Sequence, residues 1–220
     1  MLKVFHEQSS RLSLTSRAFY TDTLGPYLET ITRLSNFDMA LPMNSGAEAV
    51  ETSIKASRRW AYRTKNVESN KAEIIVADGN FHGRTTTIIS FSSDSNSKDD
   101  FGPHTPGFVS VEYGSSEAIE KAINKNTAAV LIEPIQGEGG IIVPPENYLP
   151  EVRKICTKHN VLMIMDEIQS GLGRTGKMFA FQHSNIQPDG LILGKALGGG
   201  FMPVSCFLSS KEVMQWMNPG

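Results

Sequence analysis

Two apolar segments of the sequence end on charged side chains that could take part in chemistry. The run VLMIM (161–165) leads into Asp166 and Glu167, and the run LILG (191–194) leads into Lys195. Considered singly, Asp166 is most simply an acid that ends a strand, and Lys195 a solvated surface lysine. Considered together, a carboxylate and an amine at two strand ends form either an ion pair or a cofactor site with one fixed charge and one nucleophile.

Such a pair suits the chemistry of pyridoxal 5′-phosphate (PLP). That cofactor requires an amine that forms an imine with its aldehyde and then moves a proton, which Lys195 can supply. It also requires a carboxylate, here Asp166, to keep the pyridine nitrogen protonated; at about 4 Å in a partly buried site this charge pair is worth roughly 4 kcal/mol before desolvation. The phosphate needs N–H groups at a helix start, which the Ser-Gly-Ala stretch 45–47 offers, and Phe81 could cover the ring.

The segment GLGRTGK (171–177) matches two nucleotide-binding patterns at once, G-x-G-x-x-G and G-x-x-x-x-G-K. A dinucleotide-binding loop follows its strand immediately, and it would not place Asp166 and Glu167 beside a pyrophosphate. An ATP-binding loop needs Ser or Thr after its lysine to bind Mg²⁺, and Met178 stands at that position. The sequence therefore favours glycines that let the chain turn tightly beside the cofactor, with a nucleotide-binding module as the remote alternative.

Alternating strands and helices must position these residues. Continuous apolar runs predict buried strands at 72–78, 127–135, 161–167, 189–194 and 203–210. Amphipathic patterns predict helices at 45–65, 115–126 and 147–160, the first opening with a capping box of Ser45 and Glu48. The polar stretch 90–107 is predicted to be a surface loop. This order indicates an α/β fold with a mostly parallel central sheet flanked by helices, in which ligands bind at the carboxyl ends of the strands.

The composition is that of a globular protein without a strongly charged surface. The chain has 220 residues, of which 40% are hydrophobic and 20% charged, and a net charge of −2. We therefore expect neither nucleic acid nor a membrane as a partner. The five histidines form no metal-binding pair, and Cys156 and Cys206 lie far apart, as is typical of a reducing compartment. We expect a cytoplasmic protein, or one of the mitochondrial matrix if a transit peptide precedes it.

Five blocks of sequence, in order along the chain, resemble the class III PLP-dependent aminotransferases. They are NSGAEA (44–49), GNFHGRT (79–85), EPIQGEGG (133–140), MDEIQSGLGRTG (165–176) and LGKALGGG (193–200). The flanking blocks are most similar to the ornithine aminotransferases of that family; they are LTSRAFY (14–20), LPMNSGAEAVETSIKASRRWAY (41–62) and FGPHTPGF (101–108). The resemblance implies the fold type I large domain, which resembles that of aspartate aminotransferase, and PLP as the cofactor.

The resemblance also implies roles for single residues around the cofactor. Lys195 would form the imine and move the proton, and Asp166 would pair with the pyridine nitrogen. Gln169 would bond the phenolic oxygen, while Phe81 and Ile168 would lie against the two ring faces. Two backbone amides at 46–47 would bind the phosphate. The complete cofactor set is Gly46, Ala47, Phe81, Asp166, Ile168, Gln169 and Lys195.

Two further residues would contact the substrate. The resemblance implies that Arg84 holds the substrate's α-carboxylate, and that Glu138 acts as a gate by pairing with an arginine of a later domain. Relatives with other substrates share the FHGR sequence, so Arg84 does not fix the specificity. His82 stands where some ornithine enzymes have tryptophan and is interpreted as a tolerated exchange, while Glu133 is interpreted as a buried acid without an assigned role. No metal ligand is expected.

Family members are longer, so the resemblance implies that residues 1–220 are most of the large PLP-binding domain, without the N-terminal segment and the C-terminal small domain. The implied reaction moves the terminal amino group of L-ornithine to 2-oxoglutarate, with an amino acid and a 2-oxo acid as substrates. Residues 1–220 alone are expected to be inactive, and a homodimer or larger homo-oligomer is the expected assembly. The alternatives are an acetylornithine or 4-aminobutyrate aminotransferase and, from another class, a non-catalytic subunit that only dimerises.

Overall fold

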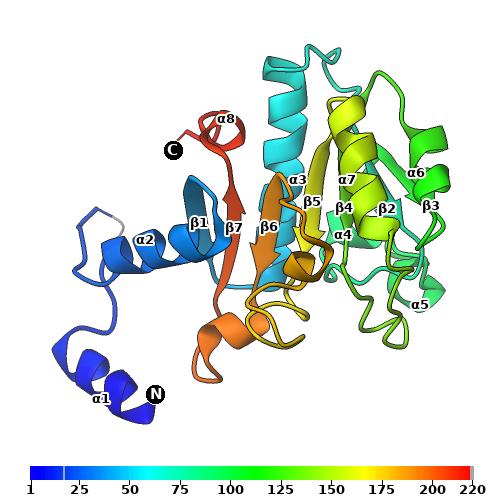
Figure 1. Cartoon of the computed structure of the whole chain (residues 1–220). Coiled ribbons are helices and arrows are strands. Elements are labelled where there is room, and N and C mark those ends of the chain that lie inside the picture. Colours follow the sequence, from blue (N-terminus) through cyan, green and yellow to red (C-terminus); the bar gives the residue numbers. More distant parts are fainter. Residues whose placement is uncertain (17, 219–220) are drawn as a thin grey trace.

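The centre of the protein is a seven-stranded sheet with the order β1-β7-β6-β5-β4-β2-β3 (Figure 1). The structure is a computed structural model and describes residues 1–16 and 18–218. Strands β2 to β6 run parallel, while β7 is antiparallel to both β6 and β1. The predicted α/β fold with a mostly parallel sheet is confirmed. The strands are β1 (Met39–Met43), β2 (Glu73–Ala77), β3 (Phe108–Val111), β4 (Thr127–Ile132), β5 (Leu162–Asp166), β6 (Gly190–Leu193) and β7 (Ser205–Ser209).

The five strands predicted from apolar runs are all present, and the two strands that were not predicted, β1 and β3, lie at the edges of the sheet. Strand β1 has no buried residue, and β3 has one, Val111, so neither carries the continuous apolar run of a strand that is covered on both faces. Strand β7 reverses direction because the link 194–204 is too short for the helical crossover that a parallel neighbour requires.

Helices cover both faces of the sheet. Helix α3 (Gly46–Arg63) and helix α8 (Lys211–Met214) share one buried cluster with the sheet, and α2 (Leu24–Ser35), α6 (Ser116–Ala122) and α7 (Tyr148–Lys158) share the cluster on the other face. Helix α1 (Leu2–Arg11) has no buried residue and projects away from the sheet in Figure 1. The remaining short elements are α4 (Thr86–Ile89), α5 (Ser95–Lys98) and the 3₁₀ turns η1 (Ala180–Ser184) and η2 (Lys195–Gly198). No helix in the described ranges has both the length and the hydrophobicity to cross a membrane.

The start of α3 is fixed by the predicted capping box. The Ser45 hydroxyl accepts a hydrogen bond from the Glu48 amide at 3.3 Å, and the Glu48 carboxylate accepts one from the Ser45 amide at 2.6 Å. Each bond satisfies a backbone donor that the first helical turn leaves without an intrahelical acceptor. The helix therefore begins at Gly46, next to Gly194, whose added Cβ would lie 3.8 Å from the Gly46 Cα.

The alternating direction of side chains along a strand determines which face of the sheet the charged residues occupy. In β5, Met163 and Met165 belong to the cluster on the α7 face, whereas Ile164 belongs to the cluster on the α3 face. Because successive strand residues point to opposite faces, the side chain of Asp166 lies on the α3 side. The parallel register pairs Ile132 of β4 with Met165 of β5, so the next residue after β4, Glu133, lies level with Asp166.

Candidate active site

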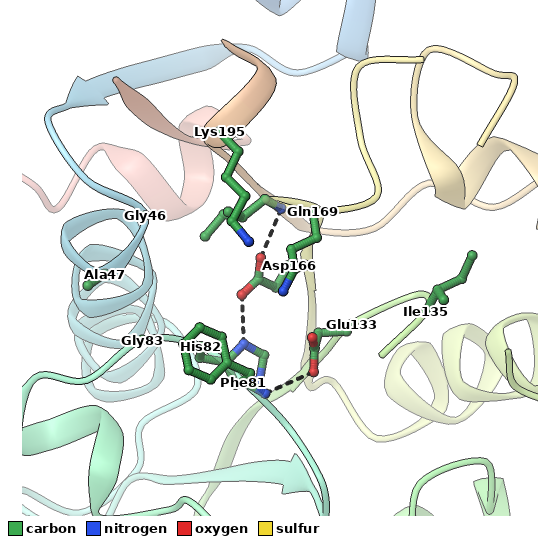
Figure 2. Close-up of a pocket in the computed structure, with 11 residues that line it drawn as sticks. Gly46, Ala47, Phe81, His82, Gly83, Glu133, Ile135, Asp166, Gln169 and Lys195 are labelled. Atoms are coloured by element: carbon green, nitrogen blue, oxygen red, sulfur yellow. Dashed lines mark hydrogen bonds and ion pairs between the residues drawn. The ribbon is translucent and has the colours of Figure 1, made fainter. Parts of the chain in front are cut away.

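A cavity of about 200 Å³ opens at the carboxyl ends of β4, β5 and β6, beside the start of α3 (Figure 2). Each of these three strands contributes a titratable residue at or just after its end, namely Glu133, Asp166 and Lys195. This is the edge of the sheet at which parallel strands are expected to present a ligand site. The full lining is Gly46, Ala47, Phe81, His82, Gly83, Glu133, Ile135, Asp166, Ile168, Gln169 and Lys195.

The structure brings all seven predicted cofactor residues together in this cavity. The two predicted substrate residues lie outside its lining. Arg84 lines a separate cavity with Asp94 and Phe101, and its guanidinium carbon lies 5.8 Å from the centre of the Phe81 ring. Glu138 lines an adjoining cavity of about 310 Å³ and accepts a hydrogen bond from the Gln169 amide nitrogen at 3.3 Å. The substrate roles of both residues remain predictions.

Lys195 enters the cavity from a strained turn. Its φ of +41° lies in the left-handed region, which costs a residue with a side chain about 1 kcal/mol or more. The preceding strand β6 is buried, but the Lys195 residue itself is exposed, and Figure 2 shows its side chain reaching toward Asp166. Within the described part of the chain, its Nζ atom makes no hydrogen bond or ion pair. The amine is therefore available to a ligand.

Asp166 is held by two partners. One carboxylate oxygen accepts a hydrogen bond from the Ile168 amide at 3.0 Å, and the other lies 2.7 Å from Nδ1 of His82 (Figure 2). The His82 side chain is fully buried, and burial alone would lower its pKa. The hydrogen bond and charge of Asp166, with the charge of Glu133, outweigh burial, so the pKa of His82 is raised.

This contact was not expected from the sequence, from which His82 was interpreted as a tolerated exchange. The other ring nitrogen of His82, Nε2, is buried and has no hydrogen-bond partner among the described residues. Only the position of His82 one residue after Phe81, in a segment that follows a strand, could have indicated a place near Asp166. The sequence carries no direct sign of which side chain bonds Asp166, because the two residues are 84 positions apart.

Glu133 is the second acid of the cavity. It is 5% exposed, and its Oε2 accepts a hydrogen bond from the Phe81 amide at 3.1 Å. Burial raises the pKa of Glu133 to about 7; the charge of His82 opposes that rise, and the charge of Asp166 adds to it. Burial therefore favours the neutral form of the Glu133 carboxyl group.

The glycine segment 171–177 is folded onto itself. The Gly173 amide donates to the Met178 carbonyl and the Gly176 amide to the Gly173 carbonyl, at 3.2 and 3.1 Å. Both glycines have φ near +90°, which confirms the predicted tight turns. These two glycine amides are occupied, and the Lys177 side chain donates to the carbonyl of Gln182, so none of these three donors is directed at a nucleotide phosphate.

Glu167 anchors the residues that follow this segment. Its two carboxylate oxygens accept hydrogen bonds from the amides of Ala180 and Phe181, each at 2.7 Å, and the residue is 1% exposed. Burial raises the pKa of Glu167 to about 7, against the lowering effect of the two amides.

This raised pKa predicts how stability depends on pH. Between the ordinary value of 4.5 and about 7, the folded protein binds more protons at Glu167 than the unfolded chain does. The free energy of unfolding should therefore fall as the pH rises through this window, by roughly 3 kcal/mol from Glu167. Glu133 and His82 act in the same direction. In Glu167→Gln, we expect the free energy of unfolding to fall less between pH 5 and pH 7.5, by about that amount, as measured by urea unfolding at both pH values. The same fall in the variant and the parent chain would contradict a raised pKa at Glu167.

Comparison with known proteins identifies the class. The family model for class-III aminotransferases matches residues 1–220, and the chain belongs to this family. It is 52% identical to the ornithine aminotransferase of Oceanobacillus iheyensis over 220 residues, which are 100% of this chain and 55% of that one. The chain therefore spans about half the length of the curated relatives it matches.

Solved structures show the same fold. The ornithine aminotransferase of Toxoplasma gondii, which holds PLP at partial occupancy in its active site, matches with a TM-score of 0.98 and 41% identity over 100% of this chain and 52% of its own. The acetylornithine aminotransferase of Elizabethkingia anophelis matches with a TM-score of 0.86 and 44% identity, over 100% of this chain and 51% of its own.

Proposed function

We propose that this chain is the cofactor-binding part of an ornithine aminotransferase, an enzyme that moves the terminal amino group of L-ornithine to 2-oxoglutarate. The observation that carries the proposal is the meeting of a free lysine amine and a buried carboxylate in one cavity of a class-III aminotransferase. The similarity to ornithine aminotransferases covers the whole chain. Residues 1–220 would form most of the large domain of the complete enzyme.

The chemistry of the cavity fits PLP. Lys195 supplies an amine for the aldehyde, and Asp166 a carboxylate for the pyridine nitrogen. The amides at 46–47 stand at the start of an 18-residue helix, whose first N–H groups and positive dipole end suit a phosphate. Phe81 and Ile168 offer apolar side chains for the ring faces. A Cβ added at position 46 would lie 2.7 Å from Ile168 Cδ1, so any side chain there would require the end of Ile168 to shift.

Each polar residue of the cavity would have a separate task in the reaction. When bound, PLP supplies the ring that accepts electrons from the reacting carbon of the amino acid. Asp166 would hold a proton at the pyridine nitrogen, and His82 would keep the Asp166 carboxylate in place through the bond between Nδ1 and Oδ2. Lys195 would bind the aldehyde and then carry a proton on Nζ. Gln169 would donate to the phenolic oxygen.

The substrates are proposed from the relatives. Arg84, next to Phe81, would reach the α-carboxylate of ornithine by a side-chain rotation, since its guanidinium is exposed. Glu138 would act as the gate that chooses between the amino acid and the oxo acid. The complete enzyme would be a homodimer or a larger homo-oligomer. The resemblance to an acetylornithine aminotransferase at 44% identity supports that activity as the second candidate.

The amine donor is tested by absorbance. With the protein extended to the length of its curated relatives and loaded with PLP, L-ornithine should reduce the visible band of the bound cofactor, and 2-oxoglutarate should restore it. We expect a rate with ornithine at least about tenfold above those with N-acetylornithine and 4-aminobutyrate, because both of these lack the charged α-amino group of ornithine and one well-placed charged contact is worth about 1.4 kcal/mol or more. A faster reaction with N-acetylornithine would replace the first candidate by the second.

A further inference from the structure

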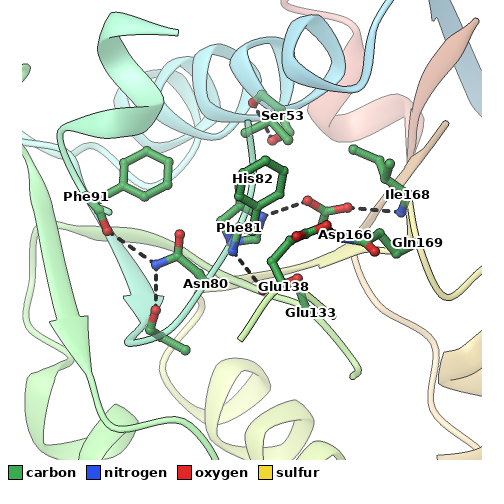
Figure 3. A network of polar contacts seen from close by, with 12 residues as sticks. Ser53, Asn80, Phe81, His82, Phe91, Glu133, Glu138, Asp166, Ile168 and Gln169 are labelled. Carbon is green, nitrogen blue, oxygen red and sulfur yellow. Dashed lines mark hydrogen bonds and ion pairs between the residues drawn. The ribbon is translucent and has the colours of Figure 1, made fainter. Parts of the chain in front are cut away.

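A short segment beyond β2 is held by acids from two neighbouring strands (Figure 3). The Phe81 amide donates to Oε2 of Glu133, just beyond β4, and the next residue, His82, bonds Asp166 at the end of β5. Since the register places residues 133 and 166 at the same level, the two acids hold consecutive residues of one segment. The segment then reaches α3, where a Cβ added at Gly83 would lie 3.0 Å from that of Ala47.

Glu133 is itself firmly placed. Its backbone carbonyl accepts a hydrogen bond from the Tyr113 hydroxyl at 3.1 Å, and its side chain is buried in the cavity wall. A carboxyl group at such a position is expensive to bury unless hydrogen bonds compensate for the lost water. The backbone of Phe81 supplies such a bond to its side chain. This bond therefore gives a physical reason for a hydrogen-bond acceptor at position 133.

We propose that Glu133 is a positioning residue of the active site: by accepting the Phe81 N–H, it holds the Phe81 ring over the cofactor and the His82 imidazole against Asp166. The part of this inference that concerns the cofactor rests on the proposed function. Glu133 needs no charge for this task, because both the carboxylate and the neutral carboxyl group keep an oxygen that can accept the bond.

The segment has a separate anchor on its other side, so loss of Glu133 should loosen it without unfolding it. The side-chain amide of Asn80 donates to the carbonyls of Ala77 and Phe91, at 2.6 and 3.3 Å (Figure 3). These bonds fix the chain where it leaves β2. Removal of the Glu133 acceptor should therefore affect residues 81–83 first.

Three variants at this position separate the acceptor from the charge. Glu133→Ala removes the acceptor, Glu133→Gln keeps a neutral one, and Glu133→Asp keeps the acid but withdraws it by one methylene group. Asp189→Asn is the matched control, because Asp189 is also a hydrogen-bonded acid beside a strand, bonding the Met163 amide at 2.7 Å, but lies outside the cavity lining.

The order of the segment and the affinity for PLP are measured independently, the first by hydrogen exchange and the second by titration. Amide hydrogen exchange of peptide 79–85 in the cofactor-free chain should be at least about tenfold faster in the Ala and Asp variants, and PLP should bind about tenfold more weakly. The Gln variant should stay within about threefold of the parent chain in both measurements. The control should lower the melting temperature but leave both measurements unchanged.

Each possible result either supports or overturns the positioning role of Glu133. Unchanged exchange in the Ala and Asp variants would overturn the proposal, and the Asp variant decides if the Ala variant does not fold. Faster exchange with unchanged PLP affinity would overturn the positioning of the cofactor site, and a Gln variant as impaired as the Ala variant would overturn the role of the acceptor. If the parent chain bound no PLP, the proposed function would fail, whereas the exchange of peptide 79–85 would still test the anchor.

Discussion

Replacement of Lys195 by alanine is expected to abolish the visible absorbance that PLP acquires when it is joined to a lysine of the protein. Lys195 is the lysine of the cavity lining, so no neighbour among the lining residues can replace its amine. Transamination by the extended, PLP-loaded enzyme should fall by at least about 10³-fold, because the variant would lose both the proposed covalent attachment and the proposed proton carrier. The melting temperature of the cofactor-free chain should change little, since the Lys195 residue is exposed and alanine keeps the same strained φ.

The appropriate control is Lys177→Ala. Lys177 lies in the glycine segment and donates to the Gln182 carbonyl, outside the cavity, so its loss should leave the band unchanged. Titration of both variants with PLP in an absorbance cell makes the comparison. Retention of the visible band by the Lys195→Ala variant would disprove the assignment of this lysine as the attachment site.

The second large effect is expected from Asp166→Asn. Asparagine has nearly the same shape and can still accept the Ile168 N–H, so the fold should remain, but the charge that would face the pyridine nitrogen of bound PLP is lost. We expect transamination by the extended enzyme to fall by about 10²- to 10⁴-fold, the range of a lost acid–base contribution. Burial lowers the pKa of His82, and the hydrogen bond and negative charge of Asp166 oppose that effect. Without the Asp166 charge, the pKa of His82 should fall.

NMR titration of the His82 ring measures that shift in the cofactor-free chain, apart from any activity. Glu167→Gln is the control, since it changes the adjacent acid, whose carboxylate bonds Ala180 and Phe181 away from the cavity. Normal turnover by the Asp166→Asn enzyme, or an unaltered pKa of His82 in that variant, would show that Asp166 does not have the proposed role.

The buried strands and the cavity were predictable from the sequence, because both depend on local patterns. Strands β4, β5 and β6 are continuous apolar runs, and the residues at their ends meet at one edge of the sheet by the rule for parallel strands. The start of α3 was predictable from the Ser45–Glu48 capping box. These signals, with the sequence blocks, suffice to place seven residues in one cavity.

The details that depend on contacts between distant residues were not predictable in this way. The bond of His82 to Asp166 and that of Phe81 to Glu133 span 84 and 52 positions and depend on the register of β4 and β5. The orientation of Arg84 depends on an exposed, flexible side chain, for which sequence spacing gives no direction. Strand β1 escaped prediction because it is bonded on one side only and is partly open to solvent.

The pairing of β1 with β7 has a consequence for the synthesis of the protein. Residues 39–43 have only one neighbour in the sheet, and that neighbour consists of residues 205–209. The Ser205 hydroxyl also donates to the Ser45 carbonyl, at the very start of α3. The pairing of β1 with β7, and with it this contact at the start of α3, can therefore form only after residues 205–209 have left the ribosome. We expect vitamin B6 to be captured after translation of this region, and its capture to stabilise only chains whose final strand is already in the sheet.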